Sequence, residues 1–153
     1  MKRLAAPLAA ALLVLASAGA CRKEADPVRA TIEALEAAVD GRDADAAGAL
    51  LAAAYSDAEH ADKAAALLTI RRYFAAYESV AASFSDLAVE RKPDLARATF
   101  VATFDGSPRK LGSLDALLPR TAKVRFEMSL VPEEGRWKVA WAGWSLVSEG
   151  TGP

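Results

Sequence analysis

The chain has 153 residues, of which 53% are hydrophobic and 25% are charged, a composition typical of one globular domain. Without a predicted leader over residues 1–20 it carries 17 basic and 20 acidic side chains, a net charge of −3. The basic residues are scattered along the chain, which argues against a nucleic-acid partner. A single cysteine excludes an intramolecular disulfide. With one histidine, and no group of acidic residues that could bind a metal by carboxylates alone, the sequence predicts no metal site. No nucleotide-binding motif is present, so we expect no cofactor.

The first 20 residues have the layout of a bacterial secretory signal. Lys2 and Arg3 form a positive n-region, residues 4–16 are apolar, and small residues follow up to Cys21. The apolar stretch is shorter than the ~20 residues that a membrane-spanning helix needs. We therefore expect residues 1–20 to be removed.

The sequence Ala18-Gly19-Ala20-Cys21 resembles the lipobox of bacterial lipoproteins. The resemblance implies a lipid on the thiol of Cys21, with the chain anchored to a membrane on the periplasmic side of the cell envelope. Arg22 in place of aspartate favours the outer membrane, by resemblance to the enterobacterial sorting rule. Residues 18–20 also fit ordinary signal peptidase, which would release a soluble periplasmic protein. In either case residues 21–26 form a lipidated or free N-terminal tether, ahead of a domain over 27–147 and a frayed tail over 148–153.

Three helices are predicted in the first half of this domain. The first begins at Asp26-Pro27, a preferred cap followed by proline at the first helical position, and ends at Gly41. Asp43 caps a short second helix with Ala47, Leu50, Leu51 and Ala54 on its inner face. The capping-box spacing of Ser56-Asp57-Ala58-Glu59 predicts a third helix over Asp57–Ala82, with an apolar stripe that continues to Phe84.

Four strands are predicted in the second half, because the hydrophobic period changes from 3.6 to 2. They cover residues 85–90, 96–104, 122–130 and 137–146. Residues 91–94, 105–108 and 132–135 are predicted turns, and Gly143 is expected to mark a β-bulge. Residues 109–120 form a connection with four leucines, at 111, 114, 117 and 118.

Helices followed by antiparallel strands indicate an α+β domain with its three helices packed on one face of the sheet. Several segments, taken in order, resemble the nuclear transport factor 2-like superfamily over residues 28–147. They are Gly41-Arg42-Asp43-Ala44-Asp45, Tyr55-Ser56-Asp57, Tyr73-Phe74 and Glu134-Gly135-Arg136-Trp137-Lys138-Val139. The resemblance implies a curved sheet around a long helix, forming a cone with an apolar pocket at its open end.

The candidate site follows from the polar and aromatic residues of this cone. His60, the only histidine, lies three positions after Asp57, and an acid–histidine pair inside an apolar pocket would suit general acid–base catalysis. The alternative is that His60, Asp57 and the nearby Asp62 are all solvated residues of a first helical turn. The residues predicted to line a pocket, or to pack in the core if the cone is closed, are Tyr55, Asp57, His60, Tyr73, Tyr77, Phe100, Phe126 and Trp141.

The sequence thus leads to a cell-envelope lipoprotein whose non-catalytic domain binds a small apolar ligand or an envelope protein. The inward positions of the predicted strands hold no acid or histidine, which argues against a proton-transfer enzyme. The superfamily nevertheless includes ketosteroid isomerases, dehydratases and polyketide cyclases, so a pocket enzyme of this kind stays open. So does a homodimeric assembly module. The sequence identifies no ligand and no reaction.

Overall fold

The computed structural model describes residues 25–110 and 118–147, which form three helices and five strands. The helices are α1 (Pro27–Asp40), α2 (Ala44–Ala49) and α3 (Lys63–Ala76). The strands are β1 (Leu51–Asp57), β2 (Tyr77–Arg91), β3 (Ala96–Pro108), β4 (Thr121–Glu133) and β5 (Arg136–Leu146). The predicted leader, Cys21, three of the four connection leucines (111, 114 and 117) and the tail lie outside the described residues.

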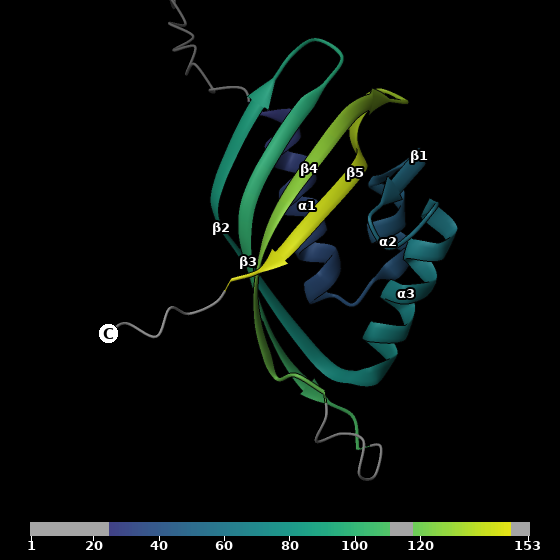
Figure 1. Cartoon of the computed structure of the whole chain (residues 1–153), viewed down its shortest axis with the longest axis vertical. Helices are drawn as coiled ribbons and strands as arrows, with labels where there is room; N and C mark the ends of the chain where they lie inside the picture. The colour runs from purple at the N-terminus through teal and green to yellow at the C-terminus, as the bar shows by residue number, and fades with distance from the viewer. Residues whose placement is uncertain (1–24, 111–117, 148–153) are drawn as a thin grey trace, which may run out of the picture.

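The strands form one sheet in the order β1-β5-β4-β3-β2. Strands β2 to β5 are antiparallel neighbours, whereas β1 pairs parallel to β5. The sheet curves around α1, and α2 and α3 lie on the same side of it (Figure 1). The predicted α+β class and the helices on one face are confirmed; the sheet is mixed rather than purely antiparallel because β1 joins it.

Helix α1 forms where the sequence predicts it. The carboxylate of Asp26 accepts a hydrogen bond from the backbone N–H of Val28 at 2.9 Å, and Pro27 occupies the first turn. The helix ends at Gly41, whose N–H bonds the carbonyl of Ala37. Its apolar stripe, with Val28 and Ile32 fully buried, packs against the concave face of the sheet.

The second predicted helix is shorter than expected, and a strand follows it. Asp43 caps α2 as predicted, accepting from the N–H of Ala46 at 2.8 Å. Leu51 and Ala54, expected on this helix, belong instead to β1, where Leu51 lies opposite Val139 of β5. Alanine-rich composition favours helix locally. The pairing with β5, almost 90 residues away in sequence, overrides that preference.

The third predicted helix is wrong at both ends. It begins at Lys63, capped by Asp62, because Asp57 ends β1 and its carboxylate binds the turn that follows. It ends at Ala76, and residues 77–91 form β2, which pairs with β3 over its length. The predicted turn at 105–108 is also wrong, since these residues extend β3 to meet the start of β2. The same segment also fits a period of two, with Val80, Ala82 and Phe84 on the inner face, so its alanines leave helix and strand undecided locally.

The predicted bulge at Gly143 is wrong as well. Gly143 pairs regularly with Glu127, and the register between β4 and β5 shifts at Ala140 instead. The extra residue reverses which side chains of β5 face the helices. Trp137 and Val139 face inward before the bulge, and Ala142 and Trp144 do so after it. The turn predicted over 132–135 is confirmed at Glu134 and Gly135, both with positive φ, whereas Pro132 and Glu133 still belong to β4.

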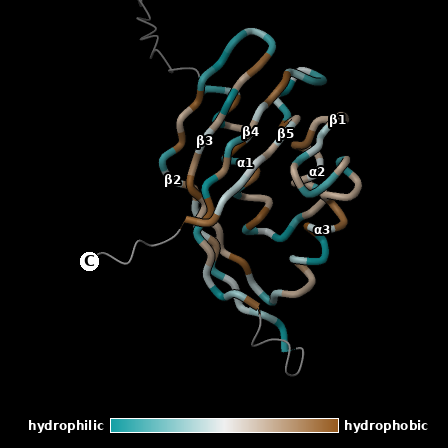
Figure 2. Tube along the Cα trace, viewed as in Figure 1, coloured by the Kyte–Doolittle hydropathy of each residue, from teal (hydrophilic) through white to brown (hydrophobic). Residues whose placement is uncertain are grey.

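Two carboxylates of α1 cover the exposed edge of the sheet at β2. Asp40 accepts from the backbone N–H of Ala82, and Glu36 accepts from that of Phe84 at 2.9 Å. These bonds satisfy donors that an edge strand otherwise leaves open. Hydrophobic and hydrophilic segments alternate along the strands, as one apolar and one solvated sheet face require (Figure 2). Among the residues that the structure describes, no helix is long and apolar enough to cross a membrane.

Candidate functional site

A cavity of about 500 Å³ lies between the concave face of the sheet and helices α1 and α3. This volume falls within the ~300–1,000 Å³ that small-molecule sites occupy. Its main wall is a row of rings on neighbouring strands: Phe84 and Phe100 stack with centroids 4.7 Å apart, and Phe100 and Phe126 at 5.4 Å. The cone is therefore open rather than fully packed.

The cavity brings together seven of the eight residues proposed from the sequence as pocket-lining. These are Tyr55, Asp57, His60, Tyr73, Tyr77, Phe100 and Phe126. Trp141 does not line it, because the bulge at Ala140 turns this side chain to the opposite face of the sheet. There its ring lies over Gly143: a Cβ at that glycine would sit 2.5 Å from the ring. Trp144 takes the place in the cavity that the sequence assigned to Trp141.

The cavity has one polar corner, formed by Tyr55, Asp57, His60 and Thr69. The hydroxyl of Tyr55 donates to Asp57 Oδ2 at 2.7 Å, and the backbone N–H groups of Glu59 and His60 donate to Asp57 Oδ1 at 2.8 and 2.7 Å. Nδ1 of His60 lies 2.9 Å from Asp57 Oδ1, and its Nε2 lies 3.0 Å from Thr69 Oγ1. The side chain of Asp57 is 1% exposed and that of His60 15%. The alternative of solvated first-turn residues is therefore wrong for Asp57 and His60, whereas Asp62 is exposed and caps α3.

The hydrogen bonds around Asp57 determine its charge and that of its tyrosine partner. Burial alone would raise the pKa of Asp57, but the hydrogen bonds from Tyr55, Glu59 and His60 hold that pKa below its ordinary value. Asp57 is therefore a carboxylate at neutral pH. Burial, then the hydrogen bond to Asp57 and its negative charge, raise the pKa of Tyr55 well above its ordinary value. This tyrosine stays protonated.

A first prediction concerns the alkaline stability of this corner. Unfolded tyrosine loses its proton near pH 10, whereas folded Tyr55 keeps it. The folding free energy that Tyr55 supplies is thus fully present below pH 10 and is lost as the pH rises through the folded pKa. We expect Tyr55→Phe to destabilise the protein at pH 8 and to reduce the further loss between pH 10 and 11, as measured by urea unfolding. Burial also raises the pKa of Tyr77, so Tyr77 accounts for the alkaline loss of stability that remains in this variant. If Tyr55→Phe lost as much unfolding free energy between pH 10 and 11 as the parent, the raised pKa of Tyr55 would be contradicted.

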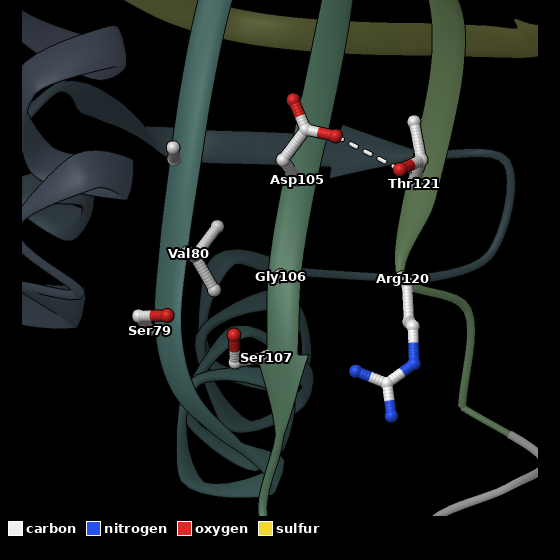
Figure 3. Close-up of a pocket in the computed structure, with 8 residues that line it drawn as sticks. Ser79, Val80, Asp105, Gly106, Ser107, Arg120 and Thr121 are labelled. Carbon is white, nitrogen blue, oxygen red and sulfur yellow. Dashed lines mark hydrogen bonds between the residues drawn. The ribbon is translucent and has the colours of Figure 1, made fainter.

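The mouth of the cavity is marked by lining residues that are also exposed to solvent. Tyr73 and Trp144 line the cavity and yet are 60% and 39% exposed. Arg120 and Asp105 stand at the same rim and also line a shallow neighbouring groove. There the hydroxyl of Thr121 donates to Asp105 at 2.8 Å, and the side chain of Arg120 points away from Asp105 (Figure 3).

Tyr77 is fixed across this rim. Its hydroxyl donates to the carbonyl of Pro119 at 2.7 Å. Its ring lies directly on Gly106, where a Cβ would come within 2.7 Å of the ring. A glycine is therefore needed at this point of β3, and Tyr77 ties the start of β2 to the segment before β4.

Sequence reasoning missed Thr69 and Trp144 as lining residues. Thr69 lies on α3, where one hydroxyl among apolar residues gives no distinctive signal. Trp144 is predicted in the last strand, but the bulge that orients it lies at Ala140 and not at Gly143 as expected. In the described ranges, no group of three or more His, Cys, Asp or Glu side chains has the arrangement of a metal site.

No protein-family model and no curated protein matches the chain in sequence. Solved structures match its fold. A nuclear transport factor 2-like superfamily protein from Salmonella enterica is similar at a TM-score of 0.67 and 12% identity, over 82% of this chain and 92% of that one. A proposed scytalone dehydratase from Novosphingobium aromaticivorans is similar at 0.70 and 11%, over 80% and 83%. The protein Bd1075 of Bdellovibrio bacteriovorus is similar at 0.67 and 9%, over 80% of this chain but 40% of its own length.

Proposed function

The described part of the chain is a domain of the nuclear transport factor 2-like fold, and on that premise we propose that it binds a small, mainly apolar ligand in its cavity. The observation that supports this most is the contrast within the cavity, which has aromatic walls and a single polar corner. Aromatic walls supply affinity, and a few fixed polar groups supply orientation, in most small-molecule sites. The exposed Tyr73 and Trp144 at the mouth leave a route of entry.

The proposal is tested by titrating 2-naphthol, a flat aromatic probe, into the mature chain carrying Cys21→Ser, which needs no detergent. We expect one site per chain by calorimetry. Ala122→Trp, which places a large ring at the inward face of β4 near the mouth, should weaken binding at least about tenfold. Lys123→Trp is the matched control, since the neighbouring side chain points to the outer face. Equal affinity in both variants, or no binding in the parent, would contradict the proposal.

A second candidate function is general acid–base catalysis, which the pairing of Asp57 with His60 inside the cavity favours. Asp57 orients the imidazole, as carboxylates do beside catalytic histidines. Nε2 of His60 faces Thr69 rather than open space, however, so the base would reach a substrate only after Thr69 rotates. Proposed dehydratases occur among proteins of this fold. Dehydration of β-hydroxy ketones, followed by absorbance and abolished in His60→Gln, would favour the enzyme over the binding domain.

We further propose that the domain is held at the cell envelope by a lipid on Cys21, facing the periplasm. The support is the lipobox-like sequence and the charge change directly after it. Two or three acyl chains anchor a protein stably, since each buried CH₂ contributes about 0.8 kcal/mol. Intact mass of the membrane-extracted protein tests this directly. A mature chain that begins at Cys21 without acyl mass would favour the soluble periplasmic alternative.

A further inference from the structure

The polar corner of the cavity is ordered around one negative charge, and this fixes the direction of its hydrogen atoms. An ionised carboxylate accepts hydrogen bonds and donates none. The hydroxyl of Tyr55, two backbone N–H groups and Nδ1 of His60 all lie within 2.7–3.0 Å of the Asp57 oxygens. Each of these groups must therefore direct its hydrogen at Asp57.

The same constraint passes through His60 to Thr69. Because Nδ1 carries the imidazole proton toward Asp57, Nε2 of neutral His60 has only a lone pair to offer. Nε2 lies 3.0 Å from Thr69 Oγ1, so the threonine hydroxyl is the donor in that contact. This is the one hydrogen bond of the Thr69 side chain in the described structure, and the hydroxyl proton of Thr69 is used in it.

Both hydroxyls of the corner consequently turn lone pairs, and no hydrogen, toward the cavity. Tyr55 and Thr69 both line the cavity, and their hydroxyl protons are directed at Asp57 and His60. Glu59, the other charged residue beside this corner, is an acceptor as well. The cation that lines the described cavity, Arg120, stands with Asp105 at the distant mouth. A ligand that presented a carbonyl or ether oxygen to this corner would meet only acceptors.

We propose that the ligand is an apolar molecule that donates a hydrogen bond, through one hydroxyl or N–H group, to Thr69 Oγ1 in the Asp57–His60–Thr69 chain. Thr69 is then a specificity-determining residue, and Asp57 and His60 are positioning residues that keep it an acceptor. The inference rests on the proposed ligand-binding function and adds the polarity of the ligand. A site whose buried polar groups are matched by the ligand rejects analogues that leave them unmatched.

Three probes with the same ring system separate this inference from the binding function itself. They are naphthalene, without a polar group; 2-naphthol, a donor; and 2-methoxynaphthalene, which only accepts. Their affinities are compared at pH 8, where ordinary histidines are neutral. In the mature chain with Cys21→Ser we expect 2-naphthol to bind about fivefold more tightly than 2-methoxynaphthalene, the factor that one neutral hydrogen bond contributes.

Thr69→Val removes the acceptor with little change in size. It should abolish the preference for 2-naphthol over 2-methoxynaphthalene, whereas Thr69→Ser, which keeps the hydroxyl, should retain it. A preference that survives Thr69→Val does not come from the Thr69 hydroxyl and overturns the inference. Equal binding of all three probes by the parent also overturns it, while the binding function stands. No binding of any probe contradicts the binding function and, with it, the inference.

Discussion

Phe100→Ala is expected to lower the free energy of unfolding by about 3–5 kcal/mol, the range measured for buried phenylalanines. The ring of Phe100 is 2% exposed and stacks between those of Phe84 and Phe126. Truncation would join its volume to the existing cavity, and the neighbouring strands hold the two partner rings too firmly to fill it. Since domains of this size are stable by about 5–15 kcal/mol, this is a large part of the total. Urea unfolding at pH 7 measures it.

Phe104→Ala is the matched control for this substitution. Phe104 lies four residues along the same strand, is only partly buried and meets Phe126 edge-on at 6.4 Å. We expect a clearly smaller loss, because part of its surface already faces solvent or the open cavity. If both variants lost the same free energy, the ring of Phe100 would not be the centre of the core.

Asp57→Ala should cost about 2–4 kcal/mol, because it removes the shared acceptor of four donors, three of which are partly buried. Tyr55 and His60 lose their side-chain partner, and two backbone N–H groups lose the bonds that close the turn after β1. We also expect weaker binding of 2-naphthol, since nothing then fixes the direction of the His60 and Thr69 hydrogens. Chemical unfolding and calorimetry measure the two effects separately.

Asp105→Ala provides the comparison for Asp57. Asp105 is an exposed carboxylate at the cavity mouth and accepts one hydrogen bond, from Thr121. Its removal should change the unfolding free energy by less than about 1 kcal/mol. If Asp57→Ala lowered the unfolding free energy as little as Asp105→Ala, water in the cavity would be replacing the carboxylate. The polar corner would then not be an ordered network.

Elements whose signals are local could be predicted from the sequence. Helix α1 needs only its cap at Asp26, its proline and its apolar stripe. The hairpin of β4 and β5 needs only alternation and the turn at Glu134 and Gly135. Together with the order of helices and strands, these were enough for the fold class and for the family resemblance.

Elements that depend on distant partners could not be predicted. β1 is Ala-Ala-Ala between Leu51 and Tyr55, and only its pairing with β5 makes it a strand. Without β1, the sequence predicts Asp57 on a helix and no acid on the inner face of the sheet. The bulge at Ala140 leaves no signal in sequence, and one displaced residue exchanged Trp141 for Trp144.

The sequence predicts most residues of the candidate site but not how they are arranged. Aromatic residues at inward positions of β3 and β4 follow directly from alternation, so Phe100 and Phe126 were accessible to sequence reasoning. The chain from Tyr55 through Asp57 and His60 to Thr69 joins β1, a turn and α3. Thr69 enters it only because α3 folds back over the end of β1, which requires the tertiary structure.

The central claim is that the cavity, and no other surface, takes an apolar ligand. Amide and methyl chemical-shift mapping by NMR with 2-naphthol on the mature Cys21→Ser chain tests it most directly. We predict that the perturbed resonances cluster at cavity residues, with Ala66, Thr69, Val124 and Met128 among them, and that residues around Trp141 on the outer face stay unchanged. Perturbations confined to the outer face, or none at saturating probe, would contradict the claim.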